Sequence, residues 1–289
     1  MINITSTTYR QDAWRRLKGN RIAMVSLALL LAIFAMCIIG PFISPYKYTA
    51  VNSDIVNQSP SLQHLFGTDD LGRDIFARIW AGGRVSMLIG VLGAFSVTVL
   101  GVLYGGISGY FGGTADDIMM RAVEVMNCIP YMIVAILIAF IAGQGIGALI
   151  LAMTITGWGG MARLVRGQVL QLREQPFVLA AKALGASPGR IISKHLLPNT
   201  VGVIIVQFTL DVPIFIFGEA FLSFIGLGIQ SPGTSWGAMA AAAQQHLMFY
   251  PYQIFFPALL ISMTMLAFNL LGDGLRDALD PTLGIQEGI

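Results

Sequence analysis

The chain has 289 residues, of which 55% are hydrophobic and 11% charged, with a mean hydropathy of +0.73. Because soluble domains average about 25% charged residues, this composition excludes a water-facing globular domain of useful size. Apolar stretches of about 20 residues, long enough to cross the hydrocarbon layer, recur along the sequence. We therefore predict an all-α polytopic membrane protein surrounded by lipid. The net charge of +2 gives no sign of nucleic-acid binding.

The chain begins with a basic N-terminal tail, residues 1–21, followed by the first predicted transmembrane helix, residues 22–44. The apolar run Ile22–Ile43 is longer than the core of a signal peptide and is not followed by a small-x-small cleavage site. We expect a retained anchor. Residues 45–84 are polar and predict an external loop with short structure of its own.

The next part of the chain, residues 85–275, predicts a five-helix core that includes a long polar segment at 162–199. The helices are expected at Val85–Gly109, from Asp117 through a kink at Pro130 to Ala142, and at Ile146–Met161, Thr200–Phe224 and Gln253–Leu271. With the first helix this makes six transmembrane spans. Residues 276–289 form the C-terminal tail.

The lysine and arginine residues predict the orientation of these spans. If there are six, thirteen of the seventeen Lys and Arg residues fall on the face that holds both termini and the 162–199 segment. The opposite face has four, Lys47, Arg73, Arg78 and Arg84. Basic loops remain on the cytoplasmic side, so both termini are predicted to lie in the cytoplasm.

The segment Pro176–Pro198 predicts two short helices joined by a turn. Pro176 suits a first helical turn, where its missing N–H costs nothing. Gly185 can adopt the left-handed conformation that ends a helix. Between them, apolar side chains repeat at helical spacing and form one face: Phe177, Ala180, Ala181 and Leu184.

The second of these helices is predicted to start at Ser187-Pro188, an N-cap followed by a first-turn proline, and to end at Pro198. An exposed apolar stripe on a short helix needs a cover. Two possibilities for what covers this stripe stay open: another protein, or the chain's own helix bundle or the plane of the lipid headgroups. The small alanine side chains favour another protein, because they allow close approach to the backbone.

The pair Ala180-Ala181, with Gly185 and then Leu197-Pro198, resembles the EAA loop of ABC-importer permeases. In that family the loop forms a coupling helix that sits in a groove of a cytoplasmic ATPase subunit. Leu179 stands where the motif usually has a glutamate. The resemblance implies an ATPase-docking set of eight residues: Phe177, Ala180, Ala181, Lys182, Leu184, Gly185, Ala186 and Ser187.

Further blocks resemble the C-type permease subunits of dipeptide, oligopeptide and nickel importers. These blocks are Arg15-Arg16-Leu17, Phe66–Asp74, Leu222–Gly228, Ser235-Trp236-Gly237 and Phe268–Pro281. The resemblance implies a type I importer in the bacterial cytoplasmic (inner) membrane. Its parts would be two different permease chains, two ABC ATPases and an extracytoplasmic binding protein.

That ATP is bound by other subunits also follows from the sequence, which has no G-x-x-x-x-G-K-[ST] loop to hold phosphates. ATP and Mg would therefore be bound by the partner ATPases. We expect this chain to be a transport subunit and not an enzyme, with no cofactor, metal or catalytic site of its own.

Asp211 and Glu219 lie in the fifth predicted helix, about 12 Å apart along its axis and within a quarter turn of each other. Charged residues inside a membrane usually face a cavity or a partner. We take both, with Asn127 near the predicted kink, as candidates for the substrate path. Two alternatives stay open: buried carboxylates bonded to the partner permease, or Glu219 near the outer interface.

On the external side, Asp69, Asp70, Arg73 and Trp236 are candidates for contact with the binding protein. The arginine within the acidic cluster argues against a calcium site, and capping of a short external helix explains the aspartates better. At the cytoplasmic end of the third helix, Asp117, Arg121 and Glu124 have the spacing of an ion-paired stripe.

The sequence thus predicts a permease subunit of an ATP-driven importer for peptides. A nickel or metal-chelate importer is the alternative within this class, although the methionines are scattered, which favours peptides. Rivals from other classes are an ATP-independent channel or membrane receptor and an intramembrane enzyme. The predicted docking helix argues against the channel, which has no use for one.

Overall fold

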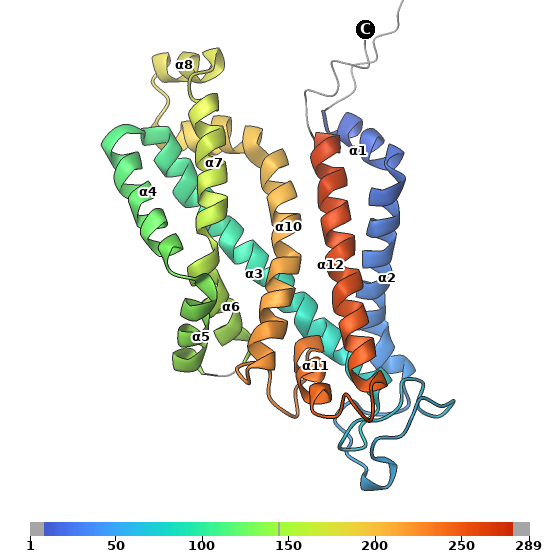
Figure 1. The fold of residues 1–289 in the computed structure, drawn as a ribbon. Coiled ribbons are helices and arrows are strands. Elements are labelled where there is room, and N and C mark those ends of the chain that lie inside the picture. The colour runs from blue at the N-terminus through green and yellow to red at the C-terminus, as the bar shows by residue number, and fades with distance from the viewer. Residues whose placement is uncertain (1–8, 144, 280–289) are drawn as a thin grey trace, which may run out of the picture.

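The computed structural model describes residues 9–143 and 145–279, and there the regular structure is helical apart from one isolated bridge between Thr68 and Asp74 (Figure 1). Three helices are each long and apolar enough to cross a membrane, α2 (Arg21–Ile43), α3 (Ile75–Phe111) and α12 (Tyr252–Leu279). A fourth, Pro188–Phe224, is one helical stretch that ends in α10 (Leu197–Phe224).

Two further crossings are bent. Helices α4 (Gly113–Cys128) and α5 (Tyr131–Ala142) meet at 83°, and α6 (Ile146–Gly157) and α7 (Gly159–Leu172) meet at 45°. The kink predicted at Pro130 is a complete break, because proline has no N–H to continue the helix. Six crossings result if each bent pair counts as one. The count and the orientation stay predictions.

Helix α3 begins at Ile75 and not at the predicted Val85, so the loop between α2 and α3 ends at residue 74 and not at 84. The reason is a strong cap: the Asp74 carboxylate accepts a hydrogen bond of 2.7 Å from the backbone N–H of Ala77. Asp74 is therefore a helix cap, as predicted for the aspartates, but it caps the long helix α3 and not a short external helix. A short 3-10 helix, η1 (Ser53–Ile55), lies within this loop.

Helix α3 crosses the bundle diagonally and packs on α7, α10 and α2 (Figure 1). Small residues allow the close approach. A Cβ atom on Gly93 would lie 2.0 Å from the Phe215 ring, and one on Gly105 would lie 2.2 Å from the carbonyl oxygen of Ala162. One end of the bundle holds α1 (Tyr9–Gly19), α8 (Pro176–Ala183) and the end of α12, while α11 (Trp236–Gln244) lies at the other end beside the α2–α3 loop (Figure 1).

A buried carboxylate joins α3, α10 and α11 near that second end. Glu219 of α10 has no exposed surface, and its oxygens accept hydrogen bonds from three serine hydroxyls. The donors are Ser86 of α3 at 3.0 Å, Ser223 at 2.7 Å and Ser235 at 2.6 Å. The buried carboxyl group thus finds these hydrogen-bond partners within its own chain, as a polar group buried in a membrane protein requires.

The same serines position α11. The Ser235 hydroxyl caps α11 by accepting from the N–H of Ala238 at 3.0 Å, and the Ser86 hydroxyl accepts from the N–H of Trp236 at 3.1 Å. The Trp236 indole is fully buried and donates from Nε1 to the carbonyl oxygen of Ile79 at 2.8 Å. The start of α11 is therefore fixed to α3 through both backbone and side-chain contacts.

We expect Glu219→Gln to lower the free energy of unfolding by about 1–3 kcal/mol. The amide keeps one acceptor oxygen in place of two, so the three serine hydroxyls can no longer all donate. Thermal unfolding of the purified protein in detergent would measure the change. Glu174→Gln is the matched control, because the Glu174 side chain is 68% exposed, and we expect a change within about 0.5 kcal/mol. Equal midpoints for the two variants would contradict the proposed role of Glu219.

Candidate functional site

Helix α8 lies at the end of the molecule that also holds α1 (Figure 1). It starts with Pro176 in its first turn, as predicted. It ends in a Schellman motif, in which Gly185 has φ +80° and donates to the carbonyl oxygen of Lys182 at 3.0 Å, while Ala186 donates to that of Ala181 at 3.0 Å. The left-handed glycine turn expected from the sequence is confirmed.

The second short helix, α9 (Pro188–Ile191), follows Ser187, whose side chain makes no capping hydrogen bond. The prediction that this helix ends at Pro198 is wrong. The π-helix η2 (Ile192–Leu196) continues from α9 directly into α10. Pro198 stands in the first turn of α10, just after the wider π turn, where its missing N–H interrupts nothing.

One face of α8 packs against its own chain. Val178 and Ala181, three residues apart, are buried in an apolar cluster that includes Val165 of α7, Ile191 and Leu196. Ala181 was predicted to belong to the docking surface, and this is corrected: its side chain faces the bundle. The alternative that α8 is covered by its own bundle thus holds for this face of the helix alone.

The opposite face of α8 is exposed and apolar. Leu184 is 88% exposed, Leu179 48% and Phe177 42%. Of the other residues predicted to dock, Ala180, Lys182, Gly185 and Ser187 are exposed and Ala186 is half-buried. Phe177, Ala180 and Leu184 follow one another at spacings of three and four residues and so share one side of the helix, whereas Leu179, two residues from Phe177, lies on another side. Exposed apolar side chains on one side of a helix outside the transmembrane bundle form a surface that favours a protein partner. We call Phe177, Ala180 and Leu184 the α8 surface.

Beneath α8, an ion pair ties α7 to α4. Arg166 donates from Nε and Nη2 to the two carboxylate oxygens of Asp116, both at 2.5 Å, and Asp116 also bonds the hydroxyl of Ser108 in α3. Arg173 at the end of α7 donates to the carbonyl oxygen of Gly109 at 3.2 Å. A bidentate arginine–carboxylate pair is strong and fixes orientation. The helices that carry α8 are therefore braced against one another.

The sequence analysis missed Asp116. It placed the ion-paired stripe on the neighbouring Asp117, but among the described residues the pair found on that stripe is Arg121–Glu124, at 3.0 Å on the exposed face. Asp116 is buried and shares the inner face of α4 with Val123, seven residues on. Seven residues make about two helical turns, so Asp116 lies on the same side of α4 as the apolar Val123 and Asp117 does not. This spacing is the signal that would have distinguished Asp116 from Asp117.

The three candidates for the substrate path do not come together. Glu219 is enclosed by the three serines, so it faces no open path in this conformation, and that prediction is corrected. Asp211 is half-buried on α10, and its carboxylate accepts from the Gln207 amide at 2.7 Å. Asn127 is exposed near the end of α4, beside Gly159 at the start of α7.

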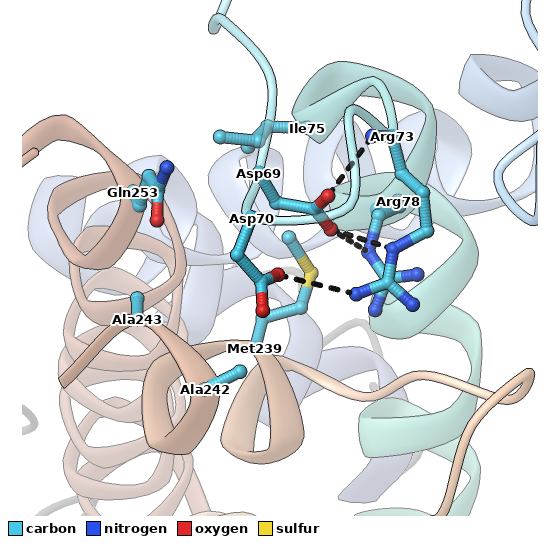
Figure 2. Close-up of a pocket in the computed structure, with 9 residues that line it drawn as sticks. All are labelled: Asp69, Asp70, Arg73, Ile75, Arg78, Met239, Ala242, Ala243 and Gln253. Atoms are coloured by element: carbon cyan, nitrogen blue, oxygen red, sulfur yellow. Dashed lines mark hydrogen bonds and ion pairs between the residues drawn. The ribbon is translucent and has the colours of Figure 1, made fainter. Parts of the chain in front are cut away.

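Three of the four external candidates, Asp69, Asp70 and Arg73, meet in a compact charged cluster (Figure 2). The Asp69 carboxylate accepts from Arg73 Nε at 2.7 Å and lies 3.3 Å from Nε of Arg78, around a cavity of about 20 Å³. Both arginines are buried, whereas the Asp70 side chain is 39% exposed. The Asp69–Arg78 pair therefore holds the α2–α3 loop on α3, Arg73 and Asp69 pair within the loop, and Asp70 reaches the surface. Trp236 is fully buried, so the contact predicted for it is wrong.

Comparison with known proteins agrees with this architecture. A model of the family "Binding-protein-dependent transport system inner membrane component" matches residues 98–285, and a model of the "N-terminal TM domain of oligopeptide transport permease C" matches residues 8–60. A solved structure of the MetNI methionine ABC transporter in an inward-facing conformation has a TM-score of 0.55. It covers 69% of this chain and 94% of the other at 20% identity, which shows a shared fold.

Several relatives match along nearly the whole chain. The dipeptide transport system permease protein DppC of Bacillus subtilis is 54% identical over 96% of this chain and 87% of its own length. The oligopeptide transport system permease protein OppC of the same organism is 48% identical, over 98% and 92%. The glutathione transport system permease protein GsiD of Escherichia coli O6:K15:H31 is 41% identical, over 94% and 90%.

The family match, the relatives and the shared fold agree with the apolar helices and with the exposed helical element at one end of the bundle. Importers of this kind hydrolyse ATP on separate ATPase subunits and receive substrate from a binding component. The chain belongs to the family of binding-protein-dependent transport system inner membrane components, and it is a permease subunit of an ABC importer in the bacterial inner membrane.

Proposed function

We propose that this chain is the permease subunit of a peptide importer and that it pairs with a second, different permease chain. Two ATPases on the cytoplasmic side and an external binding protein would complete the complex. The observation that carries the proposal is the 54% identity to a dipeptide permease over 96% of the chain. The relatives named for oligopeptides and for glutathione, which is itself a tripeptide, favour the same class of substrate.

The α8 surface is the proposed docking site of one ATPase. Val178 and Ala181 fix α8 to the bundle, while Phe177 and Leu184 on its other side stay exposed. Small Ala180 between them allows a partner to approach the backbone. Burying these apolar side chains in a groove of the ATPase would supply most of the binding free energy.

Movement of the ATPases can reach the substrate path through continuous helix. The stretch Pro188–Phe224 runs unbroken from the turn after α8 to the far end of α10. The pair Asp116–Arg166 holds α7 against α4, so a push on α8 moves a braced group of helices and not a loose loop. This element would drive the change between inward-open and outward-open states.

Asp211 is the proposed substrate-path residue of this chain. It is half-buried midway along α10, and Gln207 holds its carboxylate. A carboxylate suits the N-terminal ammonium group of a peptide. Pro213 removes one backbone hydrogen bond from the same helix and leaves the carbonyl of Thr209 without its helix donor, a feature typical of helices that line a cavity.

We expect Leu184→Glu to reduce copurification of the ATPase with the permease by about tenfold or more, because a charge would enter an apolar contact. Leu179→Glu is the matched control. It places a carboxylate on the same exposed helix, but at the position where the EAA motif has its glutamate, so we expect ATPase binding to be retained. Equal effects of the two substitutions, or none from Leu184→Glu, would contradict the assignment.

We expect Asp211→Asn to lower uptake of a labelled dipeptide by about tenfold or more while ATPase binding stays unchanged, because the amide keeps the size but loses the charge. Uptake by proteoliposomes holding the complete importer measures the first effect, and copurification measures the second. Asp54→Asn, in the exposed α2–α3 loop, is the control and should leave both unchanged. A parallel loss of uptake and of ATPase binding would rule out a role in the path.

A further inference from the structure

A polar pocket of about 480 Å³ lies where α1 and the start of α2 meet the end of α12. Its lining includes two arginines of α1, Arg15 and Arg16, and an aspartate of α12, Asp277. Asn20, between α1 and α2, and Gly274 of α12 also line it. None of these residues has a part in ATPase docking or in the proposed substrate path.

The pocket lies where α1 ends and α2 begins, at Asn20. The Asn20 side chain accepts from the N–H of Ala23 at 3.1 Å and so caps α2, while α1 ends one residue earlier. Leu17 of α1 is buried in a cluster with Ala278 of α12, which holds α1 against the end of α12. A Cβ atom on Gly274 would lie 2.4 Å from that of Ala23, so α2 and α12 touch beside the pocket.

The pocket lies at the border of the hydrocarbon layer. The apolar run of α2 begins at Ile22, directly after Asn20, and Ile22 and Val25 are 60% and 68% exposed. On α1, Trp14 is 47% exposed, and Lys18 Nζ lies 5.3 Å from the centre of its ring. Exposed tryptophan and lysine at the end of an apolar helix are typical of the headgroup level. A lipid held here could run its acyl chains along the exposed face of α2.

Its charges are arranged in two groups. Asp12 accepts from Arg15 Nη2 at 2.9 Å and from Arg16 Nη2 at 2.5 Å, which keeps the two guanidinium groups next to each other. Paired guanidinium groups match the oxygens of a phosphate. Asp277 presents a carboxylate from a different helix, and a carboxylate attracts an ammonium group and repels an added anion.

We propose that this pocket binds the headgroup of phosphatidylethanolamine, with the phosphate at Arg15 and Arg16 and the ammonium group at Asp277. Phosphatidylglycerol offers the phosphate but no cation for Asp277. Phosphatidylcholine has the same charges, but its methylated nitrogen cannot donate a hydrogen bond. The two arginines and Asp277 together therefore favour phosphatidylethanolamine over the other two headgroups.

The test uses the complete importer, stripped of lipid in detergent and then given one of these three lipids with identical acyl chains. Native mass spectrometry measures the lipid retained. We expect phosphatidylethanolamine to be retained about tenfold more strongly than the other two. Asp277→Asn, and Arg15→Gln together with Arg16→Gln, should abolish this preference, whereas Asp277→Glu should keep it. Lys18→Gln removes a positive charge from α1 outside the pocket and should have no effect.

The comparison of the three lipids on the unchanged protein tests the proposal even if a variant fails to fold. Equal retention of the three lipids would overturn it. So would strong retention of phosphatidylglycerol that survives Asp277→Asn, since that result describes a site for anions alone. Full displacement of the lipid by soluble glycerophosphoethanolamine at equal concentration would also overturn it, because the pocket would then recognise a soluble headgroup and not a membrane lipid.

Discussion

Polar groups buried among membrane helices must find their partners within the protein, and this requirement organises the structure. Glu219 satisfies it with the hydroxyls of Ser86, Ser223 and Ser235, and in doing so joins α3, α10 and the start of α11. At the opposite end, Asp116 satisfies it with Arg166 and joins α4 to α7. Because lipid is as apolar as the side chains of these helices, close packing and interhelical hydrogen bonds together hold them in place.

In the proposed mechanism, these two polar connections would allow an exposed eight-residue helix to move a membrane bundle. The Asp116 pair joins the ends of α3, α4 and α7 that lie nearest α8 into one unit, and α8 rests on that unit through Val178 and Ala181. The helical stretch Pro188–Phe224 then leads to the Glu219 network. In the proposed mechanism, a force applied to α8 would be carried along this continuous helical stretch to the other end of the bundle.

The sequence predicted the features that depend on neighbours in the chain. The apolar runs located the long helices, and Pro176 with Gly185 located α8 and its turn. Features that depend on distant contacts were missed. The helix start at Ile75 was placed too late because residues 45–84 were taken together as one polar loop, whereas in the fold the Arg78 charge of α3 is paired with Asp69.

The burial of Glu219 and Trp236 has the same origin, since it rests on Ser86 and Ile79, more than a hundred residues earlier in the chain. No local pattern marks a glutamate that three serines will enclose. Pro198 is a different case. Proline usually limits a helix, but a π turn just before it removes the conflict, and periodicity in the sequence does not reveal a π turn.

The central claim is that the outer face of α8 meets an ATPase while its inner face stays on the bundle. Site-directed crosslinking tests it most directly, after Cys37 and Cys128 are replaced by serine. A single cysteine at Leu184 should crosslink to the ATPase subunit in the assembled importer, and one at Val178 should not. Crosslinks from Leu184 to lipid or to the chain's own bundle alone would contradict the account.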